Sequence, residues 1–405
     1  MKVLLAHPGT QHSFQLARQL YKRGMLYEFH SGFAFGKDSW VYKLFSKLPS
    51  KIYNKISNRF IDEVPDRYIR RYLFLEINAM LKIRLPGQDE ETVFFRRNER
   101  FQKSISEASI TAADAVIGFD TSSWILAEKC KKMGKIFFLD VCTPHPVAND
   151  TVYLNLIKRF PEWKLPNRQK PQTHIAVELA EMELAGHIVV ASNFALGTYV
   201  KQGVGRQKIS INSYGVDSQQ FKPLKKKQMQ EDIIRFVFVG LVNARKGVPF
   251  LLETWKKISA KNIELTLIGS ISAANENYIR THFPSVIIKG KLAKKELKEQ
   301  LPNYDIFVFP SFFDGFGLVI PEAMASGLPV ITTSATCGPD LIENGNQGFV
   351  IEPGNEEQLR SAIEFFINQE DKLQSMGQQA RLKVEDLTWD AYGDQWNLLL
   401  NKYKQ

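Results

Sequence analysis

Cysteines and long hydrophobic runs are scarce in this sequence. The three cysteines, Cys130, Cys142 and Cys337, are widely separated and fit no metal-ligand spacing, which argues against structural zinc and predicts a reducing compartment. No apolar run approaches the ~18 residues that a membrane-spanning helix needs. The N-terminal MKVLLAHPG has too short an apolar core for a secretory signal, so it predicts a first buried strand. We therefore expect a cytoplasmic protein.

Two glycine-rich phosphate-binding motifs are also absent. The loops after the candidate strands lack the G-x-x-x-x-G-K-S/T of a P-loop, and no complete G-x-G-x-x-G follows a strand. The GVG at residues 203–205 lacks the third glycine and follows a helix-like segment. This disfavours a nicotinamide-dependent dehydrogenase.

The chain has the length and the pattern of a two-domain α/β protein. Its 405 residues, 44% hydrophobic and 24% charged, suit two soluble globular domains. Short apolar runs such as KVLLA, DAVIGFD, IIRFVFVG and YDIFVFP alternate with helix-like segments, which predicts parallel strands joined by crossover helices. We expect a first domain over residues 1–215, a second over 216–385 and a terminal helix over 386–405 that covers an apolar surface.

The formal net charge of +10 is concentrated in part on one segment. Residues 37–60 carry six basic residues against one acidic residue, and large apolar residues are interleaved with them. Lys47, Lys51, Lys55 and Arg59 fall on every fourth position, which is typical of a helix lying in a membrane interface. An insertion helix packed on the protein with its lysines in water remains the alternative. Nucleic acid is disfavoured, because no aromatic stacking platform accompanies the charge.

Two carboxylates flank a predicted helix start in FPSFFDGFGLVIPEAMASGLPVITT. Asp314 precedes this helix and Glu322 lies one turn inside it. The free N–H groups near Phe316, Gly317 and Leu318 would face the crevice at the carboxyl ends of the strands. A diphosphate is attracted to such N–H groups, and the two carboxylates can accept hydrogen bonds from ribose and sugar hydroxyls.

A second candidate wall follows the strand IIRFVFVG. That strand ends at Gly240, and Arg245 and Lys246 stand at the entry of the next helix. Two cations beside a helix N-terminus predict a clamp for a diphosphate.

Several collinear motifs in the second half resemble a known enzyme family. They are FVGLVNARKGVPFLLETW, LTLIG, YDIFVFPSFFDGFGLVIPEAMASGLPVITT and CGPDLIENGNQGFVIEPGN. In order and spacing they resemble the donor-binding domain of retaining glycosyltransferases of family 4, which have the GT-B fold. The resemblance covers about half of the chain strongly, and the first 180 residues match only in general layout. It implies two Rossmann-like domains facing a cleft.

The resemblance also assigns roles in the second domain. Glu322 matches the glutamate that holds the nucleotide ribose, and Asp314 matches the one that contacts the donor sugar, with Asp in place of the family's Glu. Lys246 matches the lysine that binds the donor phosphates. The family's arginine after the strand glycine is replaced here by Leu241, and Arg245 is a candidate to compensate.

In the first domain the resemblance points to two loops. Gly9 and Thr10 follow the first strand, where relatives approach the donor phosphate or the acceptor. The family commonly has a histidine after a central strand, and FFLDVCTPHP offers His145 and Asp140. We take His145 as the catalytic candidate, although a lone loop histidine is more often a bystander.

The resemblance implies a retaining sugar transfer from a nucleotide-diphosphate sugar, without a cofactor or a metal. The segment 37–60 adds the hypothesis of a lipid-linked or glycan acceptor at the inner face of an anionic membrane, as in cell-surface polysaccharide synthesis. A nucleotide-sugar epimerase of the same fold and a non-catalytic sugar-nucleotide-binding protein are the alternatives.

Overall fold

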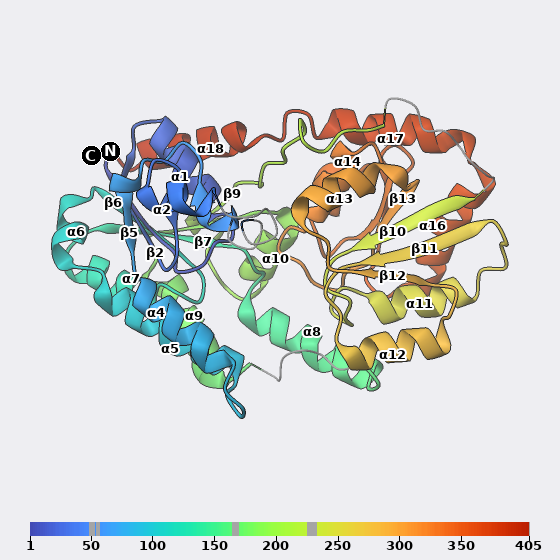
Figure 1. Cartoon of the computed structure of the whole chain (residues 1–405), viewed down its shortest axis with the longest axis horizontal. Coiled ribbons are helices and arrows are strands. Elements are labelled where there is room, and N and C mark those ends of the chain that lie inside the picture. Colours follow the sequence, from blue (N-terminus) through green and yellow to red (C-terminus); the bar gives the residue numbers. More distant parts are fainter. Residues whose placement is uncertain (48–52, 54–56, 164–169, 225–232, 405) are drawn as a thin grey trace.

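The computed structural model describes residues 1–47, 53, 57–163, 170–224 and 233–404 of the chain. They form two α/β domains, each built on a parallel sheet, as the alternation of strands and helices predicts (Figure 1). Within the described residues, every helix is too short or too polar to traverse a lipid bilayer.

The N-terminal domain contains a seven-stranded sheet in the order β5-β2-β1-β6-β7-β8-β9, in which every pairing is parallel. Its strands are β1 Val3–Ala6, β2 Leu26–Ser31, β5 Ile69–Arg71, β6 Ala115–Phe119, β7 Ile136–Val141, β8 His187–Val190 and β9 Ile209–Ile211. A separate two-stranded sheet pairs β3 Phe35–Gly36 with β4 Phe60–Ile61.

The helices of this domain are α1 Ser13–Lys22, α2 Trp40–Phe45, α4 Leu73–Ile83, α5 Glu90–Ser104, α6 Glu107–Ala112, α7 Trp124–Lys132, α8 Pro146–Arg159, α9 Gln172–Leu184 and α10 Asn193–Lys201. Because helices cover both faces of the sheet, strands such as β1 and β6 are buried at every residue and show no alternation of polar and apolar positions.

The C-terminal domain has a six-stranded parallel sheet in the order β12-β11-β10-β13-β14-β15. Its strands are β10 Ile234–Val239, β11 Ile263–Ile268, β12 Ile287–Gly290, β13 Ile306–Phe309, β14 Val330–Thr333 and β15 Gly348–Ile351. Its helices are α11 Val248–Lys256, α12 Ala273–His282, α13 Lys294–Gln300, α14 Val319–Ala325, α15 Gly338–Leu341, α16 Glu356–Asn368 and α17 Asp371–Lys383.

The last helix, α18 Trp389–Asn401, returns from the C-terminal domain to pack on α1 of the N-terminal domain (Figure 1). Its Trp396 is fully buried, and the Tyr392 carbonyl accepts a hydrogen bond from Asn212 Nδ2 at 3.1 Å. On the surface, Arg23 forms an ion pair with Asp394. The apolar face of α18 therefore packs on the N-terminal domain, so the end of the chain crosses from one domain to the other.

The domains also touch directly beside the predicted site. A Cβ on Gly315 would lie 2.1 Å from the carbonyl oxygen of Cys142, so this position excludes any larger residue. The Gly315 carbonyl in turn accepts a hydrogen bond from Ser192 Oγ at 2.6 Å. Asn193, at the start of α10, donates to both carboxylate oxygens of Asp340. The loop that carries Asp314 is thus held against the N-terminal domain.

Candidate functional site

The order of the C-terminal sheet brings two loops together. The chain runs from β10 outward to β11 and β12, and then returns to place β13 on the other side of β10. The loops after β10 and β13 consequently leave the sheet side by side and turn in opposite directions. Such a switch point is where open parallel sheets bind ligands. Arg245 and Lys246 lie in the first loop and Asp314 lies in the second.

Glycine makes the close approach of these loops possible. Gly247 has a φ of +75°, and a Cβ there would lie 1.9 Å from the Pro310 carbonyl oxygen. The neighbouring Arg245 fixes the second loop: its carbonyl accepts from Phe312 N at 2.9 Å, and its Nη1 donates to the Phe313 carbonyl at 2.9 Å. The start of α11 and the end of β13 therefore form one rigid wall.

Lys246 and Asp314 form an ion pair across the two loops. Their side chains are only 13% and 15% exposed. Burial would raise the pKa of Asp314, but the charges of Lys246 and Arg245 and a hydrogen bond from the Phe316 N–H outweigh it and lower that pKa. Burial also lowers the pKa of Lys246, against the opposing effect of Asp314. A bound phosphate would supply Lys246 with a second negative partner.

Glu322 lies in the first turn of α14, and its side chain is 14% exposed. Burial raises its pKa, while the positive charges of Lys294 and Lys298 oppose that rise. The Lys294 ammonium is 3.6 Å from Glu322 Oε1 and its side chain is 69% exposed, so this contact is a weak surface pair. Glu322 is thus a partly buried carboxylate whose acceptor oxygens are not saturated by a strong partner.

The remaining predicted residues of this domain surround the pair. Gly317 has a φ of +84°, and a Cβ there would lie 3.8 Å from the Asp314 carboxyl carbon. Phe316 is buried, and Leu318 is the residue that precedes α14. Gly240 ends β10, and its N–H donates to the Ile268 carbonyl at 2.9 Å. Because α14 has seven residues, its dipole is small and the cations dominate the local field.

The two first-domain candidates, His145 and Asp140, both form hydrogen bonds with other residues of the protein. His145 caps α8, since its Nδ1 accepts from the Val147 N–H at 3.3 Å, and its burial lowers its pKa. Asp140 Oδ2 contacts His12 Nε2 at 2.9 Å and Tyr392 OH at 3.0 Å.

Gly9 and Thr10 lie in the loop after β1, which is the neighbour of β6 at the switch point of the N-terminal sheet. The Thr10 carbonyl accepts from Ser13 Oγ at 3.0 Å. In the next position, the Gln11 side chain lies 3.6 Å from Cys142 Sγ. Since the Cys142 carbonyl contacts Gly315, this loop is linked to the C-terminal domain through one residue.

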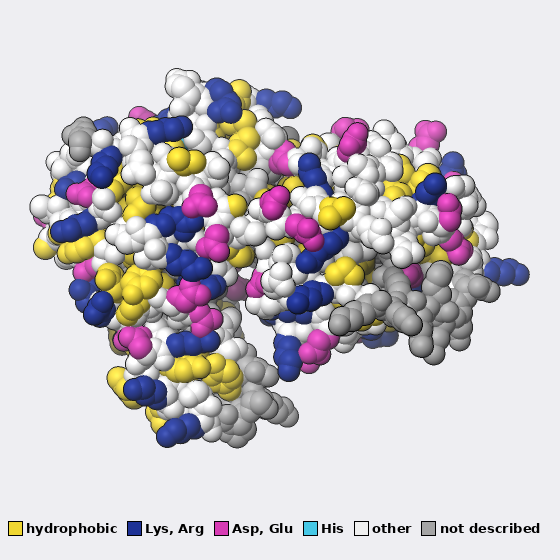
Figure 2. All heavy atoms as spheres, turned by 90° about the horizontal axis from the view of Figure 1, so that it is seen from above, with side chains coloured by type: hydrophobic (Ala, Val, Ile, Leu, Met, Phe, Trp, Pro, Cys, Tyr) yellow, Lys and Arg dark blue, Asp and Glu magenta, His cyan; other side chains and the backbone are white. Residues whose placement is uncertain are grey.

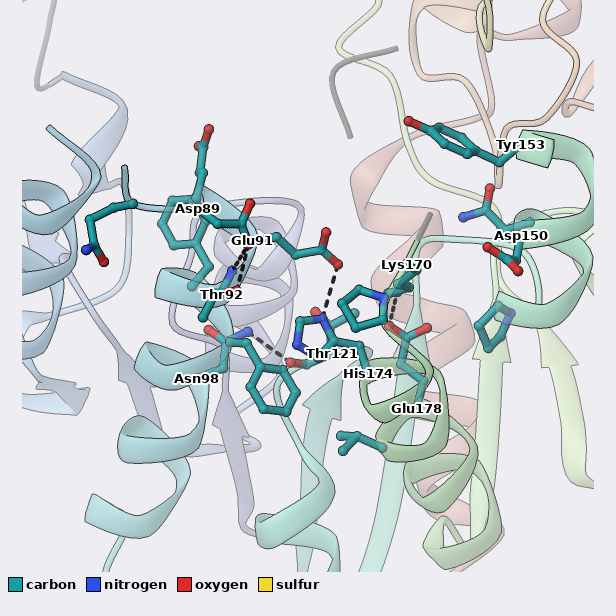
Figure 3. Close-up of a pocket in the computed structure, with 18 of the residues that line it drawn as sticks. Asp89, Glu91, Thr92, Asn98, Thr121, Asp150, Tyr153, Lys170, His174 and Glu178 are labelled. Atoms are coloured by element: carbon teal, nitrogen blue, oxygen red, sulfur yellow. Dashed lines mark hydrogen bonds and ion pairs between the residues drawn. The ribbon is translucent and has the colours of Figure 1, made fainter. Parts of the chain in front are cut away.

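A cavity of about 1040 Å³ lies in the N-terminal domain and reaches Arg245 of the C-terminal domain. Figure 3 shows Asp89 and Glu91 entering it from the start of α5, with Asp150 and Tyr153 on α8 on the other side. His174 Nδ1 lies 3.1 Å from Glu91 Oε1. Sequence reasoning did not find this cavity, because its residues come from α5, α8, α9 and several loops and form no linear motif.

The cavity is acidic in a protein that is basic overall. Its charged lining comprises Asp89, Glu90, Glu91, Asp150 and Glu178 against Lys170 and Arg245. Glu178 is paired with Lys170, yet burial raises the pKa of Glu178 to about 7. Asn98 is 8% exposed; its Nδ2 donates to the Thr121 carbonyl at 2.9 Å, and its Oδ1 has no hydrogen-bond partner. The cavity therefore offers many acceptors to a hydroxyl-rich ligand.

No group of three or more His, Cys, Asp or Glu side chains within the described residues is arranged to hold a metal ion. The groups with capacity for a ligand are the cations and carboxylates at the switch point and the acidic lining of the cavity.

Comparisons with known proteins agree with the motifs of the C-terminal domain. The family described as Glycosyl transferases group 1 matches residues 234–369. The capsular polysaccharide biosynthesis glycosyltransferase CapM of Staphylococcus aureus is 28% identical over 64% of this chain and 72% of its own length. A GDP-mannose-dependent alpha-mannosyltransferase of Corynebacterium glutamicum is 32% identical over 44% of this chain and 43% of its own length.

Solved structures share the whole architecture. Sucrose-phosphate synthase of Thermosynechococcus elongatus superposes with a TM-score of 0.68 at 17% identity, covering 99% of this chain and 98% of its own. HepE of Anabaena in complex with UDP-glucose gives a TM-score of 0.65 at 14% identity, covering 99% of this chain and 100% of its own. The two facing parallel-sheet domains constitute the GT-B fold.

Proposed function

We propose that this chain, whose residues 234–369 match the family described as Glycosyl transferases group 1 and which has the GT-B fold, transfers a sugar from a nucleotide-diphosphate sugar to an acceptor with retention. We further assign it to family 4, on the motifs around Lys246, Asp314 and Glu322, and to cell-surface polysaccharide or glycolipid synthesis at the cytoplasmic side.

One observation carries this proposal. Arg245 lines the cavity of the N-terminal domain, while the adjacent Lys246 pairs with Asp314 at the switch point of the C-terminal sheet. A donor whose diphosphate lies on these two cations would present its sugar toward the cavity. An acceptor held in the cavity would then have its hydroxyl close to the anomeric carbon.

The residues suit the charge changes of the reaction. As the bond between the anomeric carbon and the diphosphate oxygen breaks, negative charge grows on the diphosphate, and Arg245 and Lys246 would stabilise it. The acceptor oxygen forms the new bond to the anomeric carbon, and its proton passes to the departing diphosphate oxygen. The products are a glycoside and a nucleoside diphosphate. Asp314 would accept hydrogen bonds from the sugar and Glu322 from the ribose. Since protein cations can serve the leaving group, we propose that no metal is required, and a chelator should leave the rate unchanged.

The charge of the cavity lining indicates which chemical class of acceptor it can bind. Five carboxylic residues against two cations disfavour a phosphate group deep in this cavity and favour a neutral, hydroxyl-rich sugar. A lipid-linked acceptor would therefore place its terminal sugar in the cavity and its phosphate outside. An acceptor site of this volume also favours transfer over epimerisation, which needs no acceptor.

The first test is thermal stabilisation by UDP-glucose and GDP-mannose. A donor present at 100 times its Kd should stabilise the native state by about 2.7 kcal/mol. Glu322→Ala should markedly reduce that stabilisation, and unchanged stabilisation would place the ribose elsewhere. Product analysis with and without acceptor separates a transferase from an epimerase. If the wild-type protein binds the nucleotide sugar without any turnover, the non-catalytic alternative holds.

A further inference from the structure

Helix α4 buries a charged side chain and exposes large apolar ones, which is the reverse of an ordinary surface helix. Glu76, the acidic residue of α4, is 4% exposed and forms a buried ion pair with Arg97 of α5. On the opposite side, Phe74 is 76% exposed. A surface helix normally buries its apolar stripe and turns its charges to water. Here the charge faces the protein and the large apolar residue faces outward.

Phe74 belongs to a continuous stripe, which we call the α4 apolar face. It comprises Phe74, Ile77, Leu81 and Leu85, all of them exposed. Their spacing of three, four and four residues puts them on one side of the helix and its C-terminal extension. Four neighbouring exposed apolar side chains are more than the scattered single residues that soluble surfaces normally carry.

Basic residues accompany this face. The stretch 70–85 contains Lys82 and Arg84, together with Arg70 and Arg71, which form ion pairs with Glu28 and Asp66. The adjacent helix α5 adds exposed Arg96 and Arg100, and Lys103, which is paired with Glu99. Figure 2 shows hydrophobic, basic and acidic side chains interspersed over the N-terminal domain. Apolar residues rimmed by cations match the two layers of an anionic lipid surface, with headgroups over acyl chains.

A second element, which precedes β5 in the chain, also exposes apolar and basic side chains. Strand β5, the edge strand, leads directly into α4, and α2 belongs to the preceding excursion of the chain between β3 and β4. Trp40 and Leu44 of α2 are 73% and 57% exposed, and Lys43 beside them is exposed as well. The rest of the basic segment, residues 48–52 and 54–56, lies outside the described residues.

We propose that the α4 apolar face docks this protein onto an anionic phospholipid bilayer. Phe74, Leu81 and Leu85 enter the interface, and the surrounding Lys and Arg contact lipid phosphates. The face ends near the cavity, because Gly87 and Gln88, two and three residues after Leu85, line it. Docking in this orientation brings the cavity mouth toward the membrane. That last step rests on the proposed transferase function, whereas the docking itself does not.

The test is co-sedimentation of the full chain with phosphatidylglycerol-containing vesicles and with pure phosphatidylcholine vesicles. The wild type should bind the anionic vesicles more tightly. Phe74→Ser with Leu81→Ser should weaken this binding by about tenfold or more, since two exposed apolar side chains no longer enter the interface. Both residues are exposed, so the variant should keep its unfolding temperature and its stabilisation by nucleotide sugar.

A matched control is Leu382→Ser, because Leu382 is 58% exposed on the C-terminal domain. It should bind vesicles as the wild type does. Failure of the wild type to bind, or equal binding by the Phe74→Ser/Leu81→Ser variant, would overturn the proposal. So would a wild-type dimer in solution that this variant converts to a monomer, since a second copy would then cover the face. If the wild type binds the vesicles but transfers no sugar, the proposed function is contradicted and the docking proposal is not.

Discussion

The two domains each contain a buried aspartate at the centre of a polar cluster, but they use it differently. In the N-terminal domain, Asp140 is 1% exposed and contacts His12 and Tyr392, the latter from the returning helix α18. In the C-terminal domain, Asp314 keeps 15% of its side chain exposed and contacts one residue of the neighbouring loop, Lys246. Residues of β7, α18 and the loop before α1 close the first cluster, whereas the second leaves part of the Asp314 side chain exposed.

This difference separates a structural cluster from a candidate binding cluster. A buried carboxylate without partners is strongly unfavourable, so both sites must supply them. At Asp140 the partners are His12, which precedes α1, and Tyr392 of α18, and they cover a carboxylate that is almost fully buried. At Asp314 the partner is a lysine that can also bind a phosphate. The comparison predicts that changes around Asp314 alter transfer, whereas changes around Asp140 alter stability.

The largest effect should come from Lys246→Ala. Loss of one cation at the leaving diphosphate should slow transfer by about 10²–10³-fold. The initial rate with a saturating donor measures this effect, and Lys246→Arg should recover part of it. Asp140→Asn is the contrasting variant: it should lower the unfolding temperature and leave the rate nearly unchanged well below that temperature. Equal losses of rate in Asp140→Asn and Lys246→Ala would break the comparison.

The next effect should come from Glu322→Gln. A hydrogen bond to a charged acceptor contributes about 1.5–3 kcal/mol, so its loss should weaken donor binding by roughly 10–100-fold. Titration calorimetry with the nucleoside diphosphate alone isolates this contact from the sugar. Asp314→Asn, measured with the same ligand, should bind nearly as the wild type does if Asp314 contacts the sugar. The reverse ranking would exchange the two roles.

Local sequence patterns predicted the fold better than the arrangement of the site. Short apolar runs bounded by turns predicted two parallel sheets with crossover helices, and this is confirmed. The sequence also placed Lys246 and Asp314 beside one crevice, but it did not predict their direct ion pair. That contact exists because β13 returns to the side of β10, and strand order is a property of the whole sheet.

Two features of the N-terminal domain had no signal that sequence reasoning could use. The cavity takes Glu91, Asp150 and Glu178 from three separate helices, so no spacing reveals it. In α4, periodicity shows that Phe74 and Leu81 share a face, but it does not show which face is buried. The usual assumption that the apolar side points inward would have been wrong, because Glu76 occupies that side.

We expect a buried carboxyl group of the acidic cavity, Glu178, to make the stability of the protein depend on pH. Glu178 has a folded-state pKa of about 7, above its ordinary value of 4.5, because it is buried. Between these two pH values the folded state binds more protons than the unfolded state, so stability falls as pH rises. Asp314, whose pKa is lowered, has the opposite sign and loses its contribution as pH falls. Glu178→Gln should therefore remove a decline in the free energy of unfolding, on the order of 1–3 kcal/mol, that the wild type shows as pH rises.

Urea unfolding at about pH 5 and about pH 8 measures this linkage, as the difference between the two free energies of unfolding. The wild type and Glu178→Gln should differ mainly at the higher pH. Glu90→Gln, which alters an exposed carboxylate of the same cavity, should follow the wild type at both values. An identical pH dependence for wild type and Glu178→Gln would show that Lys170 compensates the buried charge fully.

The smallest effect should come from changing His145. It tests whether His145 has a structural role, as we expect for Asp140, or a role in the reaction, as we expect for Lys246. As the cap of α8, His145 should contribute about 1 kcal/mol to stability, which His145→Ala loses. His145→Asn should recover most of it, since the Asn side chain can accept the same hydrogen bond. Both variants should transfer sugar at nearly the wild-type rate at a temperature where they are folded. If His145→Ala and His145→Asn instead both slow transfer by a similar large factor, the histidine acts in the reaction. Loss of the helix cap alone would affect the Ala variant more than the Asn variant, because Asn can still cap the helix.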